Sequence, residues 1–155
     1  SAPGPVASDK FVRKSIEYAI NQGVPREKIV FGIPFYGRLW NETNGAVING
    51  DGVALHMVPD LLETYNGVVT YDENQKSAKA TFEIKSGDQP FKLNNWSDPL
   101  PVGKYTLWFE NDRSIKEKLN LVHEYKIKGT GSWSLGQENK EIWDFYRLWL
   151  DGKRF

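Results

Sequence analysis

KIVFGIPFYGRLW, residues 28–40, is the stretch that decides the fold of this chain. Its β-branched and aromatic residues follow one another with almost no alternation between apolar and polar positions. Such a strand is expected to be buried on both faces, as in parallel sheets covered by helices. A helix that is capped by Ser8 or Asp9, runs to about Gln22 and stops at Gly23 is predicted before it. Helix, short loop and doubly buried strand form half of a βαβ unit, which indicates an α/β fold.

The same order returns near the C-terminus in GTGSWSLGQEN, residues 129–139. A helix with a capping box at Ser114 and Glu117 is predicted before this second short buried strand. A final helix follows it, with an apolar face at the helical spacing. That face is made of Ile142, Phe145, Tyr146 and Trp149. The strand itself poses a question, because Trp133 is either ordinary core or the floor of a binding site.

Residues 41–111 show a different pattern of predicted secondary structure from the segments on either side. A short helix is predicted near Pro59 to Tyr65, and VVTYDENQKSAKATFEI then predicts a hairpin. GKYTLWFEN predicts a further strand, which carries Trp108. We therefore expect a small antiparallel α+β insertion between two α/β segments, residues 1–40 and 112–155, which together form one incomplete domain.

Composition narrows the classes of function. Lys plus Arg and Asp plus Glu are each 20, so there is no basic excess for nucleic acid or an anionic membrane. The chain has no cysteine and no apolar run of about 18 residues, which argues against disulfides and membrane spans. His56 and His123 lack metal-ligand spacing, and no nucleotide-binding or serine-hydrolase motif is present, so no metal or other cofactor is expected. The aromatic content of 14% weakly favours a carbohydrate binder, although a tryptophan-rich core is the simpler explanation.

Polar and aromatic side chains follow both predicted α/β strands. Because the carboxyl ends of parallel strands meet at one edge of a sheet, we expect these side chains to share a rim. They are Tyr36, Arg38, Trp40, Trp133, Gln137 and Glu138. Aromatic faces beside amide, guanidinium and carboxylate groups suit a sugar pocket. The residues alone leave open the alternative that Tyr36 and Trp133 fill a core and that Arg38 pairs with a carboxylate.

Residues 28–40 resemble the seventh strand of family 18 glycoside hydrolases, the chitinase-like (β/α)8 barrels, whose pattern there is close to G-x-P-x-Y-G-R. YTLWFENDRSIKEKLNLVHEYKIKGTGSWSLGQENKEIW, residues 105–143, resembles their closing segment. The resemblance covers nearly the whole chain and is closest to the bacterial cell-wall and spore-associated branch. It implies the C-terminal portion of a TIM barrel, namely strands seven and eight with their helices, plus the α+β insertion.

The resemblance also implies roles for particular residues. Trp133 is expected to line the sugar subsite next to the scissile bond, with Tyr36 and Arg38 beside it and Trp108 in one wall of the cleft. The catalytic signature of the family, D-x-x-D-x-D-x-E, is absent from the sequence, so no catalytic residue is assigned. A whole barrel needs roughly 250 residues. We therefore expect a fragment of such a hydrolase, whether a proteolytic product, an expressed piece or the product of a truncated gene, that is inactive alone.

The expected ligand is a glycan that contains N-acetylglucosamine, either chitin or peptidoglycan, and the expected location is extracellular or at the cell wall. Exposed strand edges predict either self-association or pairing with a chain that carries the other barrel strands. Two other functions stay open: a non-catalytic glycan-binding module that uses Tyr36, Trp108 and Trp133, and a structural or interaction module without a ligand.

Overall fold

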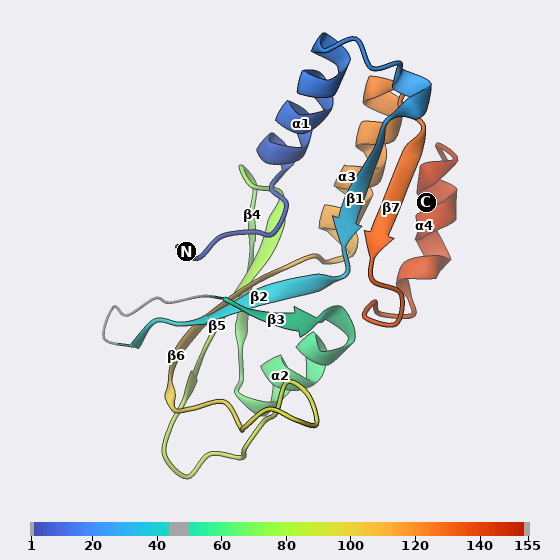
Figure 1. Ribbon diagram of the computed structural model, residues 1–155. Coiled ribbons are helices and arrows are strands. Elements are labelled where there is room, and N and C mark those ends of the chain that lie inside the picture. The colour runs from blue at the N-terminus through green and yellow to red at the C-terminus, as the bar shows by residue number, and fades with distance from the viewer. Residues whose placement is uncertain (1, 44–49, 154–155) are drawn as a thin grey trace.

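The computed structural model describes residues 2–43 and 50–153, which form a mixed α/β structure with two sheets (Figure 1). Strands β1 (Val30–Pro34) and β7 (Gly129–Trp133) form a parallel pair. The other sheet is antiparallel, with the strand order β3-β2-β6-β5-β4. Its strands are β2 (Tyr36–Asn41), β3 (Asp51–Ala54), β4 (Val68–Asp72), β5 (Ser77–Ile84) and β6 (Gly103–Phe109). The predicted hairpin in the insertion is β4–β5 and is confirmed.

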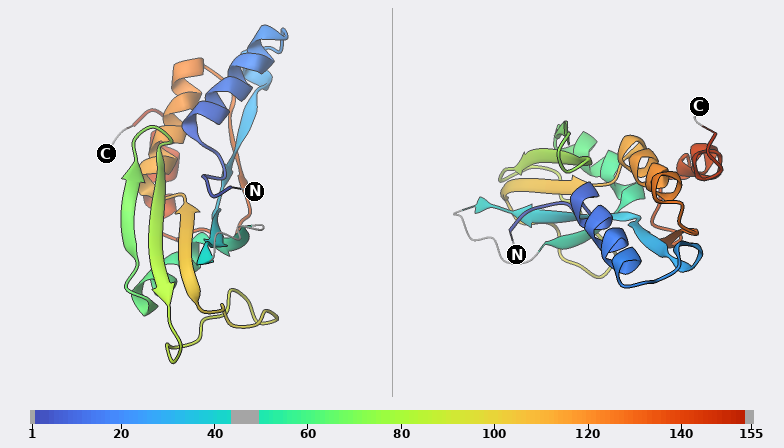
Figure 2. Two further views of the ribbon diagram at one scale, coloured as in Figure 1. Left: turned by 90° about the vertical axis from the view of Figure 1, so that its left-hand side faces the viewer. Right: turned by 90° about the horizontal axis from the view of Figure 1, so that it is seen from above.

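Three helices gather around the parallel pair, and one packs on the antiparallel sheet (Figures 1 and 2). The first three are α1 (Asp9–Asn21), α3 (Asp112–Tyr125) and α4 (Ile142–Leu150). The fourth is α2 (Val58–Thr64), which follows the short 3-10 turn η3 (Leu55–Met57); a similar turn, η1 (Arg26–Lys28), precedes β1. Among the residues described, no helix is long and apolar enough to cross a bilayer.

The decisive run of residues 28–40 serves both sheets, which corrects the prediction of a single strand. It divides at Phe35: β1 ends at Pro34, and β2 begins at Tyr36 in the antiparallel sheet. Tyr36, Arg38 and Trp40 therefore belong to the antiparallel sheet and do not continue the parallel strand. An unbroken apolar run gives no signal for such a change of partner, because both halves are equally suited to a buried strand.

The parallel pair is covered on one face only, so the expectation of burial on both faces is wrong for this chain. Ile33 is fully buried, whereas Val30 on β1 is 52% exposed. Gly32 and Gly131, which are register partners, are exposed as well. On the covered face, Thr130 and Ser132 of β7 meet Tyr146 of α4. The open face consists largely of glycine and carries Trp133 at its end.

The helices α1 and α3 each begin after a side chain that caps the N-terminus. Ser8 caps α1 by accepting a hydrogen bond from the backbone N–H of Phe11, as predicted. Helix α3 begins earlier than predicted, because Asn111 is its N-cap and forms the capping box with Ser114. The side chain of Glu117, the predicted box partner, is instead paired with Lys76 at 3.1 Å.

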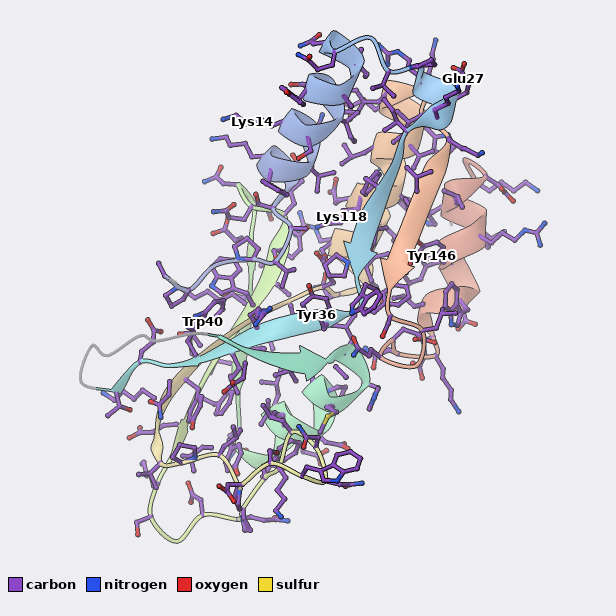
Figure 3. The ribbon with its side chains drawn as sticks, viewed as in Figure 1. Lys14, Glu27, Tyr36, Trp40, Lys118 and Tyr146 are labelled. Carbon is purple, nitrogen blue, oxygen red and sulfur yellow. The ribbon has the colours of Figure 1, made fainter. Side chains whose placement is uncertain are left out.

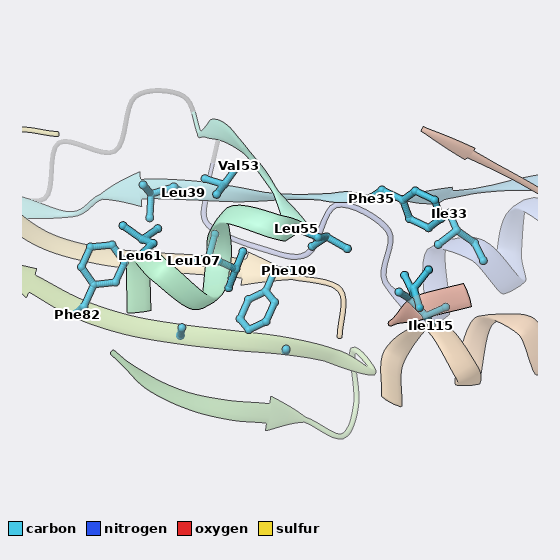
Figure 4. Close-up of a cluster of buried hydrophobic side chains, with 14 of the residues drawn as sticks. Ile33, Phe35, Leu39, Val53, Leu55, Leu61, Phe82, Leu107, Phe109 and Ile115 are labelled. Carbon is cyan, nitrogen blue, oxygen red and sulfur yellow. The ribbon is translucent and has the colours of Figure 1, made fainter. Parts of the chain in front are cut away.

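One apolar cluster joins the two sheets (Figure 4). Leu39, Leu61 and Leu107 pack between the antiparallel sheet and α2, each at most 1% exposed. Ile33 and Ile115 continue the cluster under the parallel pair and α3. The shared core places the ends of β1 and β7 against the insertion.

Candidate functional site

Strands β1 and β7 end side by side, and Trp133 lies at that end. Pro34 is its register partner, and the backbone N–H of Phe35 donates to the Trp133 carbonyl oxygen at 2.6 Å. The Trp133 side chain is 71% exposed, and the Trp133–Ser134 peptide bond is cis. The tryptophan that could have been ordinary core therefore presents an open ring at the carboxyl end of a parallel sheet, where ligand sites of α/β proteins are built.

Rigid aromatic packing lies behind the end of β7. The Tyr146 hydroxyl lies 2.7 Å from Oγ1 of Thr130 and 3.2 Å from Oγ of Ser132. Phe35 meets Trp143 edge-on with ring centroids 5.8 Å apart, and Tyr146 at 6.2 Å. Edge-to-face contacts and a bound hydroxyl fix the strand end against α4. Figure 3 shows Tyr146 on the α4 side of the parallel pair and Tyr36 at its end.

Glu138 is held within its own loop. One carboxylate oxygen accepts the backbone N–H of Gly136 at 2.7 Å, and the other accepts the indole N–H of Trp143 at 3.3 Å. The pKa of the Glu138 carboxyl is lowered, first by the hydrogen bond from its own backbone N–H and then by those of Gly136 and Trp143, while burial opposes the shift. The carboxylate thus stabilises the loop that follows Trp133.

Gln137 links this loop to the insertion. Its carbonyl oxygen accepts the backbone N–H of His56 at 3.0 Å, and its side-chain Oε1 is buried without a hydrogen-bond partner. Ser134 closes the turn by accepting the backbone N–H of Gln137 at 3.1 Å. Leu135, between them, is 75% exposed. From the sequence, His56 is considered only as a metal ligand and Leu135 is not singled out, although the glycine after Leu135 is typical of a tight turn.

Tyr36 and Arg38 lie on one face of β2, next to the strand ends. Tyr36 is half-buried, and the Arg38 guanidinium carbon lies 6.0 Å from the centre of its ring. Arg38 also donates from Nη1 to the Gly50 carbonyl oxygen at 2.6 Å. The expected alternative of an Arg38–carboxylate pair is not found among the described residues, since no salt bridge there includes Arg38.

Trp40 and Trp108 share that face of the sheet but are buried, at 5% and 7% exposure. Trp108 is the register partner of both Arg38 and Lys79, and the Lys79 ammonium lies 5.4 Å from its ring centre. Trp40 packs under Gly50, where an added Cβ would lie 2.7 Å from its ring. Neither ring therefore offers an open stacking face, and both support the sheet that carries Arg38.

The predicted residues thus form two neighbouring groups. Trp133, Gln137 and Glu138 surround the end of β7, whereas the remainder lie on β2 and β6 of the insertion sheet. A groove of about 640 Å³ runs beside the second group. It is lined by Ala2, Gly4, Pro5, Val6, Arg38, Trp40 and Gly50. Within residues 2–43 and 50–153, no three His, Asp or Glu side chains are grouped so that they could hold a metal ion.

Comparison with known proteins places this geometry in a family. The sequence of residues 3–138 matches the family model of the glycosyl hydrolases family 18. The chain belongs to glycosyl hydrolases family 18. The cortical fragment-lytic enzyme of Bacillus subtilis, one family 18 relative, is 29% identical over 136 residues, which are 85% of this chain and 27% of that protein.

Solved structures show the same fold. A chitinase from Chromobacterium violaceum superposes with a TM-score of 0.78 at 27% identity, over 96% of this chain and 40% of that one. A family 18 chitinase from Cycas revoluta in complex with (GlcNAc)3 gives 0.67 at 21% identity, over 97% and 41%. The chain spans 37%, 28% and 27% of the length of three curated relatives that it matches.

Proposed function

We propose that this chain supplies one side of the glycan cleft of a family 18 glycoside hydrolase that acts on N-acetylglucosamine-containing glycans. The observation that carries the proposal is the open Trp133 ring, 71% exposed at the paired ends of β1 and β7. A flat indole on a fixed strand end is suited to stacking against a pyranose ring. Tyr36 and Arg38 stand at the same end and supply a hydroxyl and a guanidinium for sugar oxygens.

In this proposal, β1 and β7 are strands seven and eight of a (β/α)8 barrel. Their parallel pairing, the helices on a single face and the open glycine-rich face support this assignment, because the other face of a barrel strand points into the barrel. The block from Tyr36 to Phe109 is the α+β insertion and forms one wall of the cleft. Gln137 and Trp108 connect and support that wall.

The substrate class rests on the relatives. One is named as a cortical fragment-lytic enzyme and two as chitinases, of which one is bound to (GlcNAc)3. Chitin and peptidoglycan share β-1,4-linked N-acetylglucosamine units, and both occur outside the cell membrane. We therefore assign the chain to an extracellular or cell-wall location.

Under this proposal, the 155-residue chain binds glycan but does not hydrolyse it. Its sequence lacks D-x-x-D-x-D-x-E, the signature whose final glutamate protonates the leaving oxygen. Family 18 hydrolysis is substrate-assisted and still needs this acid. Purified chain is expected to leave a chromogenic N-acetylglucosamine oligomer intact, and measurable turnover would refute this part of the proposal.

Calorimetric titration with (GlcNAc)4 tests the binding. Wild-type chain is expected to bind, and Trp133→Ala is expected to weaken binding about tenfold or more, since a central aromatic contact contributes at least ~1.4 kcal/mol. Trp133→Phe should keep part of the affinity because it keeps a stacking face. Tyr18→Ala, which removes a 68% exposed ring on α1, is the matched control and should bind as wild type does.

A glycan-binding module without hydrolytic function is the second candidate. The same open Trp133 favours it, together with the carboxylate of Glu138, which is engaged in its loop rather than free for proton transfer. Adding a chain that carries the other barrel strands separates the two candidates. Restored hydrolysis supports the enzyme, whereas unchanged binding without turnover supports the module.

A further inference from the structure

The most exposed large apolar side chain in the described part of the molecule is far from Trp133 in the sequence. Trp96 is 91% exposed, compared with 75% for Leu135 and 71% for Trp133. It belongs to the segment between β5 and β6, and that segment lies at the opposite end of the molecule from α1 and near α2 (Figure 1). Leaving an indole in water costs much of the free energy that its burial would release.

The backbone that carries Trp96 is held in place. Asn94 Oδ1 accepts the backbone N–H of Trp96 at 2.9 Å and that of Ser97 at 2.8 Å. Oγ of Ser97 in turn accepts a hydrogen bond from the backbone N–H of Asn94 at 3.3 Å. At the base of the loop, Leu100 donates its backbone N–H to the Phe91 carbonyl oxygen at 2.9 Å. An ordered turn presents the ring, so little backbone entropy is lost when a ligand binds.

Some side chains of this loop pack against the core, and others face solvent. Phe91, Leu93 and Leu100 turn inward and pack against the main core. The exposed residues beside Trp96 in the sequence are mostly polar, namely Lys92, Asn94, Asn95 and Asp98, with Pro99 as the apolar exception. A protein-binding hot spot is ringed by contacts that exclude water, whereas the sequence around this indole is mostly exposed and polar. One flat ring among amide and carboxylate groups is the chemistry that recognises a sugar with hydroxyls at its edge.

We propose that Trp96 is a second glycan-contact site, which holds an extended polymer of N-acetylglucosamine units apart from the end of β7. The inference rests on the proposed glycan function and adds to it a preference for polymer over short oligosaccharide. A short oligosaccharide occupies Trp133 alone, whereas a polymer chain offers many further sugar units for Trp96 to contact. The polymer is the shared chemistry of chitin and peptidoglycan glycan strands.

Sedimentation with insoluble chitin and with purified peptidoglycan sacculi tests the site in two arms. Trp96→Ala should lower binding about three- to tenfold in at least one arm, while (GlcNAc)4 affinity measured by calorimetry stays within twofold of wild type. Trp96→Phe should recover part of the polymer binding, and Tyr18→Ala should behave as wild type in every measurement. A loss in only one arm identifies the polymer.

The outcomes separate this inference from the proposed function. If wild-type chain binds neither (GlcNAc)4 nor polymer, the proposed glycan function fails and this inference fails with it. If wild type binds polymer and Trp96→Ala binds it equally well in both arms, the second site is overturned while the function stands. If Trp96→Ala weakens (GlcNAc)4 to the same extent as polymer, the separate polymer site is likewise overturned. Because Trp96 is exposed, circular dichroism should show the same fold for every variant.

Discussion

Nζ of Lys118 lies 2.8 Å from Oε1 of Glu110, and the two side chains are only 1% and 3% exposed. Ser114 donates its hydroxyl to the other Glu110 oxygen, whereas the Lys118 ammonium makes no hydrogen bond of ordinary geometry. Glu110 follows β6 directly, and Lys118 lies on α3 (Figure 3). The buried ion pair thus joins the insertion sheet to the helix beside the parallel pair.

Removing only one member of this ion pair should destabilise the fold. Lys118→Met leaves the Glu110 carboxylate buried without its cation, and we expect it to lower the free energy of unfolding by about 3–5 kcal/mol. Urea unfolding followed by circular dichroism measures the change. The double variant Glu110→Leu/Lys118→Met should recover much of the loss. Arg147→Ala, in the exposed pair with Asp151, is the control and should stay within about 0.5 kcal/mol of wild type.

Glu138 should make the loop after Trp133 sensitive to acid. Its hydrogen bonds lower the folded-state pKa of the carboxyl below its ordinary value of 4.5, so the ionised form stabilises the fold above that pH. This contribution is lost as pH falls through the folded-state pKa. Glu138→Gln should therefore cost about 0.5–1 kcal/mol at neutral pH and progressively less in acid. Unfolding midpoints at several pH values measure this, with the exposed Glu141→Gln as control; a gap that is independent of pH would contradict the assignment.

Tyr71 should give an alkaline transition. Burial raises its pKa from 10.0 to about 12, and the Arg113 guanidinium, 3.9 Å from the ring centre, opposes that shift. Between these two values the unfolded chain loses a proton that the folded chain keeps, so stability falls as pH rises. Tyr71→Phe should remove this fall while it retains the ring. Ultraviolet titration and unfolding at alkaline pH measure it, and Tyr18→Phe is the matched loss of an exposed hydroxyl.

The parallel pair should associate with other chains. In the described residues, β1 and β7 pair only with each other, and Val30 is 52% exposed on the open face. Unpaired edges beside exposed apolar surface favour pairing with a second copy. Val30→Lys should weaken association about tenfold in analytical ultracentrifugation, whereas Val24→Lys, in a loop, should not. A monomer at high concentration for the wild type would argue against this interface.

Much of the secondary structure follows from local pattern. The α1 cap at Ser8, the β4–β5 hairpin and the buried face of Ile142, Phe145 and Tyr146 on α4 are all found as predicted. These features depend on spacing within a few residues, which a single sequence displays.

The pairing of strands and the exposure of particular side chains are harder to predict from the sequence. The division of the apolar run at Phe35 depends on different partners for its two halves: β1 pairs with the distant β7, whereas β2 pairs with the distant β6 and the nearer β3. Exposure of Trp133 and burial of Trp108 likewise depend on which tertiary surfaces cover them. The exposed Trp96 lay in a stretch without periodicity, where no pattern distinguishes a presented ring from a core one.

The block of residues 36–109 leaves and rejoins the α/β part of the chain through neighbouring strands. It begins with β2 immediately after Phe35 and closes with β6, and Arg38 and Trp108 face each other across the two. A block whose first and last strands are hydrogen-bonded to each other is closed on itself, so its far loops can lengthen or shorten without displacing β1 or β7. In evolution, such a block can change its far loops while the ends of the parallel strands stay where they are.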